Sequence, residues 1–124
     1  MTMLKILGRK TSSNVQKVLW CCGEIGLAFE REDVGGPFGR NNEPEYLALN
    51  PNALVPTVIE DGFVLWESNA IVRYLCAKHA KGTLYPSDAK MNADADRWMD
   101  WQQTTLGPPM GILFRGLLKS PANI

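Results

Sequence analysis

One stretch of this sequence, Asn50–Ser68, combines the residue types that can hold a small anion or a peptide. Val55-Pro56 predicts an extended entry into a strand, because proline fixes its own φ and disfavours helical geometry in the residue before it. Asp61-Gly62 predicts a tight hairpin turn between two apolar runs, and Ser68 stands where a helix N-cap is expected. A hairpin that leads into a capped helix presents free backbone N–H groups beside a strand edge. The stretch therefore predicts a corner that could hold a small anion or a peptide.

The three cysteines and the single histidine do not predict a disulfide framework, a metal site or a catalytic site. Cys21, Cys22 and Cys76 are an odd number, which argues against a disulfide framework. His79 is far in sequence from Cys21 and Cys22, and no Cys-x-x-Cys occurs, so a zinc site is not expected. Unpaired cysteine commonly packs as a small apolar residue, so we expect core positions for all three. We interpret His79 as a helix-end residue, with no catalytic role.

The elements that would position this corner can be read from apolar periodicity and from turn residues. The polar residues Ser12, Ser13 and Asn14 precede a helical pattern from Val15, which Gly26 should end. The predicted order is β-α-β-α-β-β-α, a thioredoxin-like α/β domain with a mixed four-stranded sheet and helices on both faces. The other predicted elements are Leu4–Leu7, Phe29–Val34, Glu43–Leu49 with Pro44 in its first turn, Thr57–Ile59, Phe63–Trp66 and Asn69–Lys78.

The sequence after residue 82 predicts helices only. Gly82–Asp88 is typical of a linker and ends in a candidate N-cap, and Met91–Leu106 has helical periodicity. Gly107-Pro108-Pro109 is expected to break this helix, and Met110–Lys119 to begin another. Large aromatic residues at helical spacing are more often core residues than a ligand platform, and we expect this for Trp66, Trp98 and Trp101.

Composition excludes several classes of function. The formal net charge is zero, so no basic field indicates binding to nucleic acid. No apolar run approaches the roughly 20 residues of a membrane-spanning helix. The apolar run at the N-terminus is too short for a signal peptide, which favours a cytoplasmic protein.

Three segments, in this order and at this spacing, resemble the glutathione transferase family. The segments are Ser12-Ser13-Asn14-Val15-Gln16-Lys17-Val18, Asn50-Pro51-Asn52-Ala53-Leu54-Val55-Pro56, and Trp66-Glu67-Ser68-Asn69-Ala70-Ile71 with Tyr74-Leu75. The likeness is nearest to cytosolic bacterial members with a serine-type site, akin to the theta, delta and zeta classes. It implies a homodimeric transferase that acts in detoxification, with glutathione as co-substrate, a small electrophile as second substrate and no metal.

The resemblance also implies the domain organisation. Residues 1–82 match the thioredoxin-like, glutathione-binding domain of the family. Residues 88–124 match only the beginning of its all-helical C-terminal domain, which usually continues through several more helices. The chain is therefore expected to have an incomplete, truncated all-α segment.

A catalytic residue follows from the first matching segment. Ser12 matches the family's activating serine, whose hydroxyl donates to the glutathione sulfur and favours the reactive thiolate. Asn14 is the second choice for this donor and Ser13 the third. On residue chemistry alone, helix capping is the favoured interpretation of these three residues, and the two other matching segments reverse that preference.

The other two segments imply the binding residues. In the family the proline that matches Pro56 is cis, which exposes the Val55 backbone to the cysteinyl unit as to an added strand. Ser68 would bind the γ-glutamyl carboxylate, and Glu67 would face the ligand's ammonium.

The glycyl carboxylate is expected near Arg40 and Asn52. The family often has glycine, lysine or histidine around the next position, where this chain has Ala53. The match is therefore looser at this end of the site.

Two other classes of function compete with a transferase. A truncated, non-catalytic module that binds glutathione or dimerises would follow from the short helical segment. A disulfide oxidoreductase would fit the sheet order, but no cysteine occupies the Ser12–Asn14 corner.

Overall fold

The computed structural model describes residues 3–119, and the chain divides into two compact units, Met1–Tyr85 and Pro86–Ile124. The first unit contains the sheet. In the second unit, the chain is helical from residue 89 to residue 119. No helix in the described range is long and apolar enough to cross a membrane.

The sheet of the first unit has four strands in the order β2-β1-β3-β4. β1 (Leu4–Leu7) runs parallel to β2 (Phe29–Glu32) and antiparallel to β3 (Thr57–Glu60). β3 pairs with β4 (Phe63–Trp66) as an antiparallel hairpin. This mixed sheet confirms the predicted thioredoxin-like architecture.

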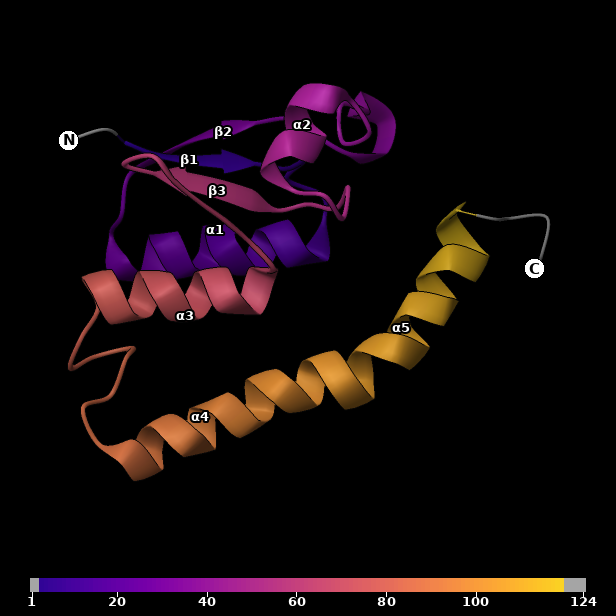
Figure 1. The fold of residues 1–124 in the computed structure, drawn as a ribbon. Coiled ribbons are helices and arrows are strands. Elements are labelled where there is room, and N and C mark those ends of the chain that lie inside the picture. The colour runs from indigo at the N-terminus through magenta and orange to yellow at the C-terminus, as the bar shows by residue number, and fades with distance from the viewer. Residues whose placement is uncertain (1–2, 120–124) are drawn as a thin grey trace. The chain divides into compact units, whose positions relative to one another are not determined.

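Helices cover both faces of the sheet (Figure 1). α1 (Ser13–Ile25) and α3 (Ser68–His79) pack against each other on one face, and the short α2 (Pro44–Leu49) lies on the other. The larger core cluster includes Leu4, Ile6, Val18, Cys22, Val58, Ile71 and Leu75, and the smaller one comprises Leu7, Val34 and Tyr46.

Both ends of α1 have the predicted caps. The Ser12 side chain accepts from the Val15 N–H at the N-terminus. Gly26 adopts left-handed geometry (φ 68°), and its N–H reaches the carbonyls of Cys22 and Gly23. A residue with a Cβ would resist this φ, so the glycine sets the end of the helix.

The turn between β3 and β4 also has the conformation that its residue types predict. Asp61 and Gly62 both have positive φ, 50° and 82°, as the common two-residue hairpin turn requires. The register pairs Glu60 with Phe63 across this turn.

The prediction that Ser68 caps α3 is wrong, because the capping residue is Glu67. The Glu67 carboxylate accepts from the Ala70 N–H at 2.8 Å, while Ser68 is already the first helical residue. Glutamate is not among the preferred N-caps, so residue preference favoured the serine. The positive φ of Glu67 (83°) brings its longer side chain back over the helix end.

The expected break at Gly107-Pro108-Pro109 is also wrong. α4 (Ala89–Trp101), capped by Asp88, passes through a wider π-helical turn, Gln102–Leu106, directly into α5 (Gly107–Phe114). The Gly107 N–H bonds to the Gln102 carbonyl, and a Cβ at Gly107 would lie 3.0 Å from that oxygen. The prolines then occupy the first turn of α5, the part of a helix in which proline is best tolerated.

The three tryptophans are not core residues. Trp66, Trp98 and Trp101 are all exposed, and the rings of Trp98 and Trp101 meet edge to face with centroids 5.7 Å apart. The apolar side chains that α4, α5 and the turns joined to them expose are Met91, Trp98, Trp101, Leu106, Met110, Ile112, Leu113, Phe114 and Leu117.

Candidate functional site

Ser12 lies at the start of α1 with extended backbone geometry, and only 9% of it is exposed. Its Oγ accepts a long hydrogen bond, 3.4 Å, from the Val15 N–H. A hydroxyl that accepts in this bond keeps its own proton for a different acceptor. Ser12 therefore caps the helix and can donate to a ligand at the same time, so the two sequence interpretations are compatible.

Ser68 and Asn14 join the N-termini of α3 and α1. The Ser68 hydroxyl donates to Asn14 Oδ1 at 3.4 Å, and Ser68 is buried while Asn14 is exposed. The two helix ends each offer partial positive charge from unpaired N–H groups. The corner expected from the sequence thus includes Asn14 and Ser68 in direct contact.

Lys17 brings a cation to the same helix pair, which sequence reasoning missed. Its Nζ donates to Asn69 Oδ1 at 3.0 Å. Burial lowers the pKa of Lys17, and the nearby Glu67 carboxylate partly offsets this. Lys17 follows Asn14 by three residues and so lies on the same helix face. This spacing is the one sequence feature that could have identified Lys17 as a residue of the site.

Glu67 has an uncommon backbone for a residue with a side chain, φ 83°. Such conformations persist where surrounding structure holds them, and they cluster at functional sites. Its carboxylate accepts from the Ala70 N–H through Oε1, and an ionised carboxylate has sites for several donors.

The Val55-Pro56 peptide bond is cis, as the resemblance implied. Among backbone hydrogen bonds outside helices and strands in residues 3–119, none uses the N–H or C=O of Val55. The loop before it is held by buried polar groups: Asn50 Nδ2 donates to the Leu54 carbonyl at 3.0 Å and to Thr57 Oγ1 at 3.1 Å. The Tyr46 hydroxyl contacts the same two oxygens.

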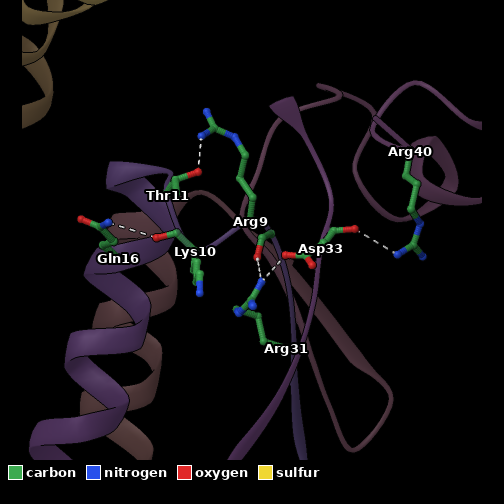
Figure 2. A network of polar contacts seen from close by, with 8 residues as sticks. Arg9, Lys10, Thr11, Gln16, Arg31, Asp33 and Arg40 are labelled. Atoms are coloured by element: carbon green, nitrogen blue, oxygen red, sulfur yellow. Dashed lines mark hydrogen bonds and ion pairs between the residues drawn. The ribbon is translucent and has the colours of Figure 1, made fainter. Parts of the chain in front are cut away.

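Arg40 and Asn52 are occupied by contacts within the chain. Arg40 pairs with Glu32 at 3.1 Å. It also donates to the Asp33 backbone carbonyl at 3.2 Å (Figure 2). Asn52 donates through both its backbone and its side chain to Asn50 Oδ1, each at 3.0 Å. Neither contacts Ser12, Asn14 or Ser68 through a bond in the described part of the chain.

Arg9 is a second residue that sequence reasoning missed. Its Nη1 donates to Thr11 Oγ1 at 2.8 Å (Figure 2), and its backbone carbonyl accepts from the Ser12 N–H at 3.2 Å. Its Nε is buried without a hydrogen-bond partner. Nothing in the local sequence distinguishes Arg9 from an ordinary exposed arginine.

The cysteines lie away from this corner and are free and buried, which confirms their core positions. Burial raises the pKa of Cys21 to about 12 and that of Cys22 to about 11, so neither is a reactive thiolate at neutral pH. Within residues 3–119, no three His, Cys, Asp or Glu residues come together as a metal site.

Comparisons with known proteins all match the same family. A family model, the glutathione S-transferase N-terminal domain, matches residues 11–78, which is just over half of the 124 residues. The glutathione S-transferase GstB of Escherichia coli strain K12 is 40% identical over 121 residues, which cover 96% of this chain and 58% of that protein.

Solved structures agree with this match. The theta class glutathione S-transferase from Xanthomonas axonopodis pv. citri, crystallised with glutathione bound, has a TM-score of 0.91 and 49% identity. That comparison covers 98% of this chain and 58% of the other. Poplar glutathione transferase F1 gives a TM-score of 0.87 at 34% identity, over 95% of this chain and 56% of the other. The chain therefore spans less than two thirds of the length of these relatives.

Proposed function

Since this chain belongs to the glutathione S-transferase family, we propose that it binds glutathione and activates the glutathione thiol for attack on an electrophile. The observation that carries the proposal is the placement of Ser12. Its hydroxyl stands at a helix N-terminus with its proton available, and Asn14 on the same helix contacts Ser68 across the corner. A thiol placed at this corner would meet a donor and two helix ends of positive potential.

The chemistry is a nucleophilic transfer by sulfur. A hydrogen bond from Ser12 to the sulfur and the potential of the α1 N-terminus both favour the thiolate, so the thiol pKa falls below its ordinary value. The thiol proton passes to solvent. The sulfur lone pair then forms a C–S bond, and the leaving group departs with the electron pair of the bond that breaks.

The rest of the corner would hold the tripeptide. The N–H and C=O of Val55 would pair with the cysteinyl unit, in the way that a strand is added to a sheet edge. Ser68 would bind the γ-glutamyl carboxylate at the start of α3. The Glu67 carboxylate would accept from the ammonium, and Lys17 would hold Asn69 and offset the charge of Glu67.

The glycyl end would lie toward Arg40, Asn52 and Pro56. Arg40 would have to exchange its exposed ion pair with Glu32 for the ligand. Exposed pairs contribute roughly 0–1 kcal/mol, so this exchange costs little.

Activity and binding are tested separately. We expect the wild-type chain to bind glutathione, seen by intrinsic tryptophan fluorescence, and Ser68→Ala to bind it at least about tenfold more weakly, because a bond to a charged group is lost. The exposed Ser87 provides a matched control, and Ser87→Ala should bind as the wild type does. Absence of binding by the wild type would remove the proposal.

For catalysis, we expect Ser12→Ala to conjugate glutathione to a generic aryl halide about 10- to 100-fold more slowly at pH 7. Because the thiol pKa would return toward its ordinary value, the lost rate should recover as the pH rises toward about 9. A pH–rate profile of both proteins checks this. Equal rates and equal profiles would assign Ser12 to helix capping alone.

A second candidate is a non-catalytic module of the same family that binds glutathione or dimerises. The observation that favours it is the exposed apolar side chains of α4 and α5. Glutathione binding without conjugation by any variant would select it. For either function we propose a cytoplasmic homodimer, and for the transferase a role in detoxification.

A further inference from the structure

Arg9 connects the Ser12 corner to the loop that follows β2. Its backbone N–H donates to the Val34 carbonyl at 2.9 Å, and its carbonyl accepts from the Ser12 N–H at 3.2 Å. The side chain rises beside Thr11, which accepts from Nη1 (Figure 2). The backbone of Arg9 is therefore fixed beside Ser12, and its guanidinium lies beside Thr11, the residue before Ser12.

The loop after β2 is built around this side chain. A Cβ at Gly36 would lie 2.6 Å from Arg9 Nε and 2.8 Å from its Cδ, closer than real Cβ atoms come. A Cβ at Gly35 would meet Val55 Cγ1 at 3.3 Å. Glycine at both positions lets the backbone close over Arg9 and Val55 together, which places the guanidinium beside the residue proposed to hold the cysteinyl unit.

Arg9 lacks the partner that its neighbours have. Arg31 pairs with Asp33 at 2.7 Å and Arg40 with Glu32 at 3.1 Å, whereas Arg9 has no carboxylate partner within residues 3–119. Its Nε is buried and makes no hydrogen bond. Buried donors without acceptors are rare because they forfeit solvation, and each needs an explanation.

We propose that Arg9 forms a carboxylate-binding subsite beside Ser12, which rests on the proposed glutathione transferase function and deepens it. Nη1 is committed to Thr11, and the Nε edge is the side of the guanidinium that still requires an acceptor. Guanidinium binds carboxylate through two parallel N–H···O bonds, a geometry that lysine cannot supply. Nε packs against Gly36, so a carboxylate could accept the Nε hydrogen only after the Gly36 backbone shifts, and the proposal includes this local shift.

Two carboxylates could occupy the subsite. One is the glycyl carboxylate of glutathione, and the other is a carboxylate on the electrophile. The chemistry is the same for both, so matched ligand pairs distinguish them: glutathione against its glycyl amide, and a chloronitrobenzoate against the corresponding chloronitrobenzamide.

The experiment uses the full chain. Dissociation constants for the two forms of glutathione are measured by tryptophan fluorescence, and kcat/KM for the two aryl chlorides is measured with glutathione. In one of the two pairs, we expect the wild type to prefer the carboxylate by about tenfold or more, and Arg9→Gln to lose that preference. The uncharged member of the pair should change by less than about twofold.

Two further variants separate binding from structural support. Arg9→Lys keeps the charge and the aliphatic stem but loses the fork, so it should keep only part of the preference. Lys10→Gln removes the adjacent exposed charge and should leave the preference intact. If the Arg9→Gln protein loses affinity equally for both members of each pair, Arg9 merely supports the loop and the subsite is refuted.

Measurements on the wild type alone also test the proposed subsite. No preference for a carboxylate in either pair would overturn the subsite while leaving the proposed function in place. Failure of the wild type to bind either form of glutathione would overturn both. A preference in the glutathione pair assigns the subsite to the glycyl end, and one in the aryl chloride pair assigns it to the electrophile.

Discussion

Glu60, at the end of β3, is a carboxylate almost fully withdrawn from water, with 7% of its side chain exposed. Tyr74 Oη donates to it at 2.6 Å and Lys78 Nζ at 2.9 Å, and His79 Nε2 lies 2.9 Å from its second oxygen. Burial alone would raise the pKa of Glu60, but these partners outweigh burial and hold its pKa below the ordinary value. His79 thus has a structural role at the helix end.

This cluster predicts a pH dependence of stability. Because the folded-state pKa is lowered, the Glu60 charge stabilises the fold above an unfolded pKa of roughly 4.3, and this contribution is lost as pH falls through the folded pKa. Glu60→Gln should lower the free energy of unfolding by about 1–3 kcal/mol at pH 7. The difference from wild type should shrink as the pH falls below about 5, measured by denaturant titration.

Asp61 provides the matched control for this experiment. It lies 3.7 Å from the same Lys78 amine, but its side chain is 46% exposed. Asparagine tolerates the positive φ at this turn position, so Asp61→Asn should change stability by less than about 1 kcal/mol. A Glu60→Gln deficit that stays constant at every pH would show that the carboxylate charge does not contribute.

At the scale of one element, the glycine inside α1 and the glycine that ends it have opposite expected effects. Gly23 lies inside the helix with open space around its Cβ direction, so Gly23→Ala should stabilise by roughly 0.5–1 kcal/mol. Gly26 ends the helix at φ 68°, so Gly26→Ala should destabilise by about 1–2 kcal/mol. Thermal unfolding of both variants checks the pair. Shifts of the same sign would contradict the assigned helix end.

The elements that depend on sequence features within a few residues could be predicted from the sequence. Gly26, the Asp61-Gly62 turn and the apolar period from Val15 each act within a few residues, and the structure has them where expected. Glu67 took the cap predicted for Ser68 because a backbone φ of 83° gives a longer side chain access to the helix end. No propensity encodes that geometry.

Much of the corner depends on tertiary contacts that no local pattern contains. The Ser68–Asn14 bond spans 54 residues and the Lys17–Asn69 bond spans 52. The buried Nε of Arg9 depends on a glycine from another loop. The resemblance supplied Ser12, Val55 and Ser68 as candidates. It did not supply Arg9 or Lys17, because their positions follow from packing.

At the scale of the whole molecule, the main feature is the exposed apolar surface of the second unit. Ile112 is 66% exposed and Leu113 is 52% exposed. Since large exposed apolar patches mark interaction sites, we expect the chain to self-associate. Sedimentation should show an assembly larger than a monomer, and Ile112→Glu with Leu113→Glu should shift it toward the monomer. Lys90→Glu, at an exposed polar position of α4, is the control.

A compact monomer that binds no apolar dye would contradict this prediction. It would also remove the observation that favours the dimerising module. The proposed transferase chemistry would be unaffected, because every residue assigned to it belongs to the first unit.

The bonds between α1 and α3 also bear on the order in which the fold forms. The polar contacts across this helix pair, including Cys21 Sγ to Cys76 Sγ at 3.6 Å, join residues 52 to 55 positions apart. Contacts at such separation carry a loop-closure entropy that local turns do not, so we expect them to form after the local turns. A nascent chain that ends before α3 lacks half of the corner. In refolding experiments, the proposed binding of glutathione would therefore appear only when the two helices dock, and not when either helix forms.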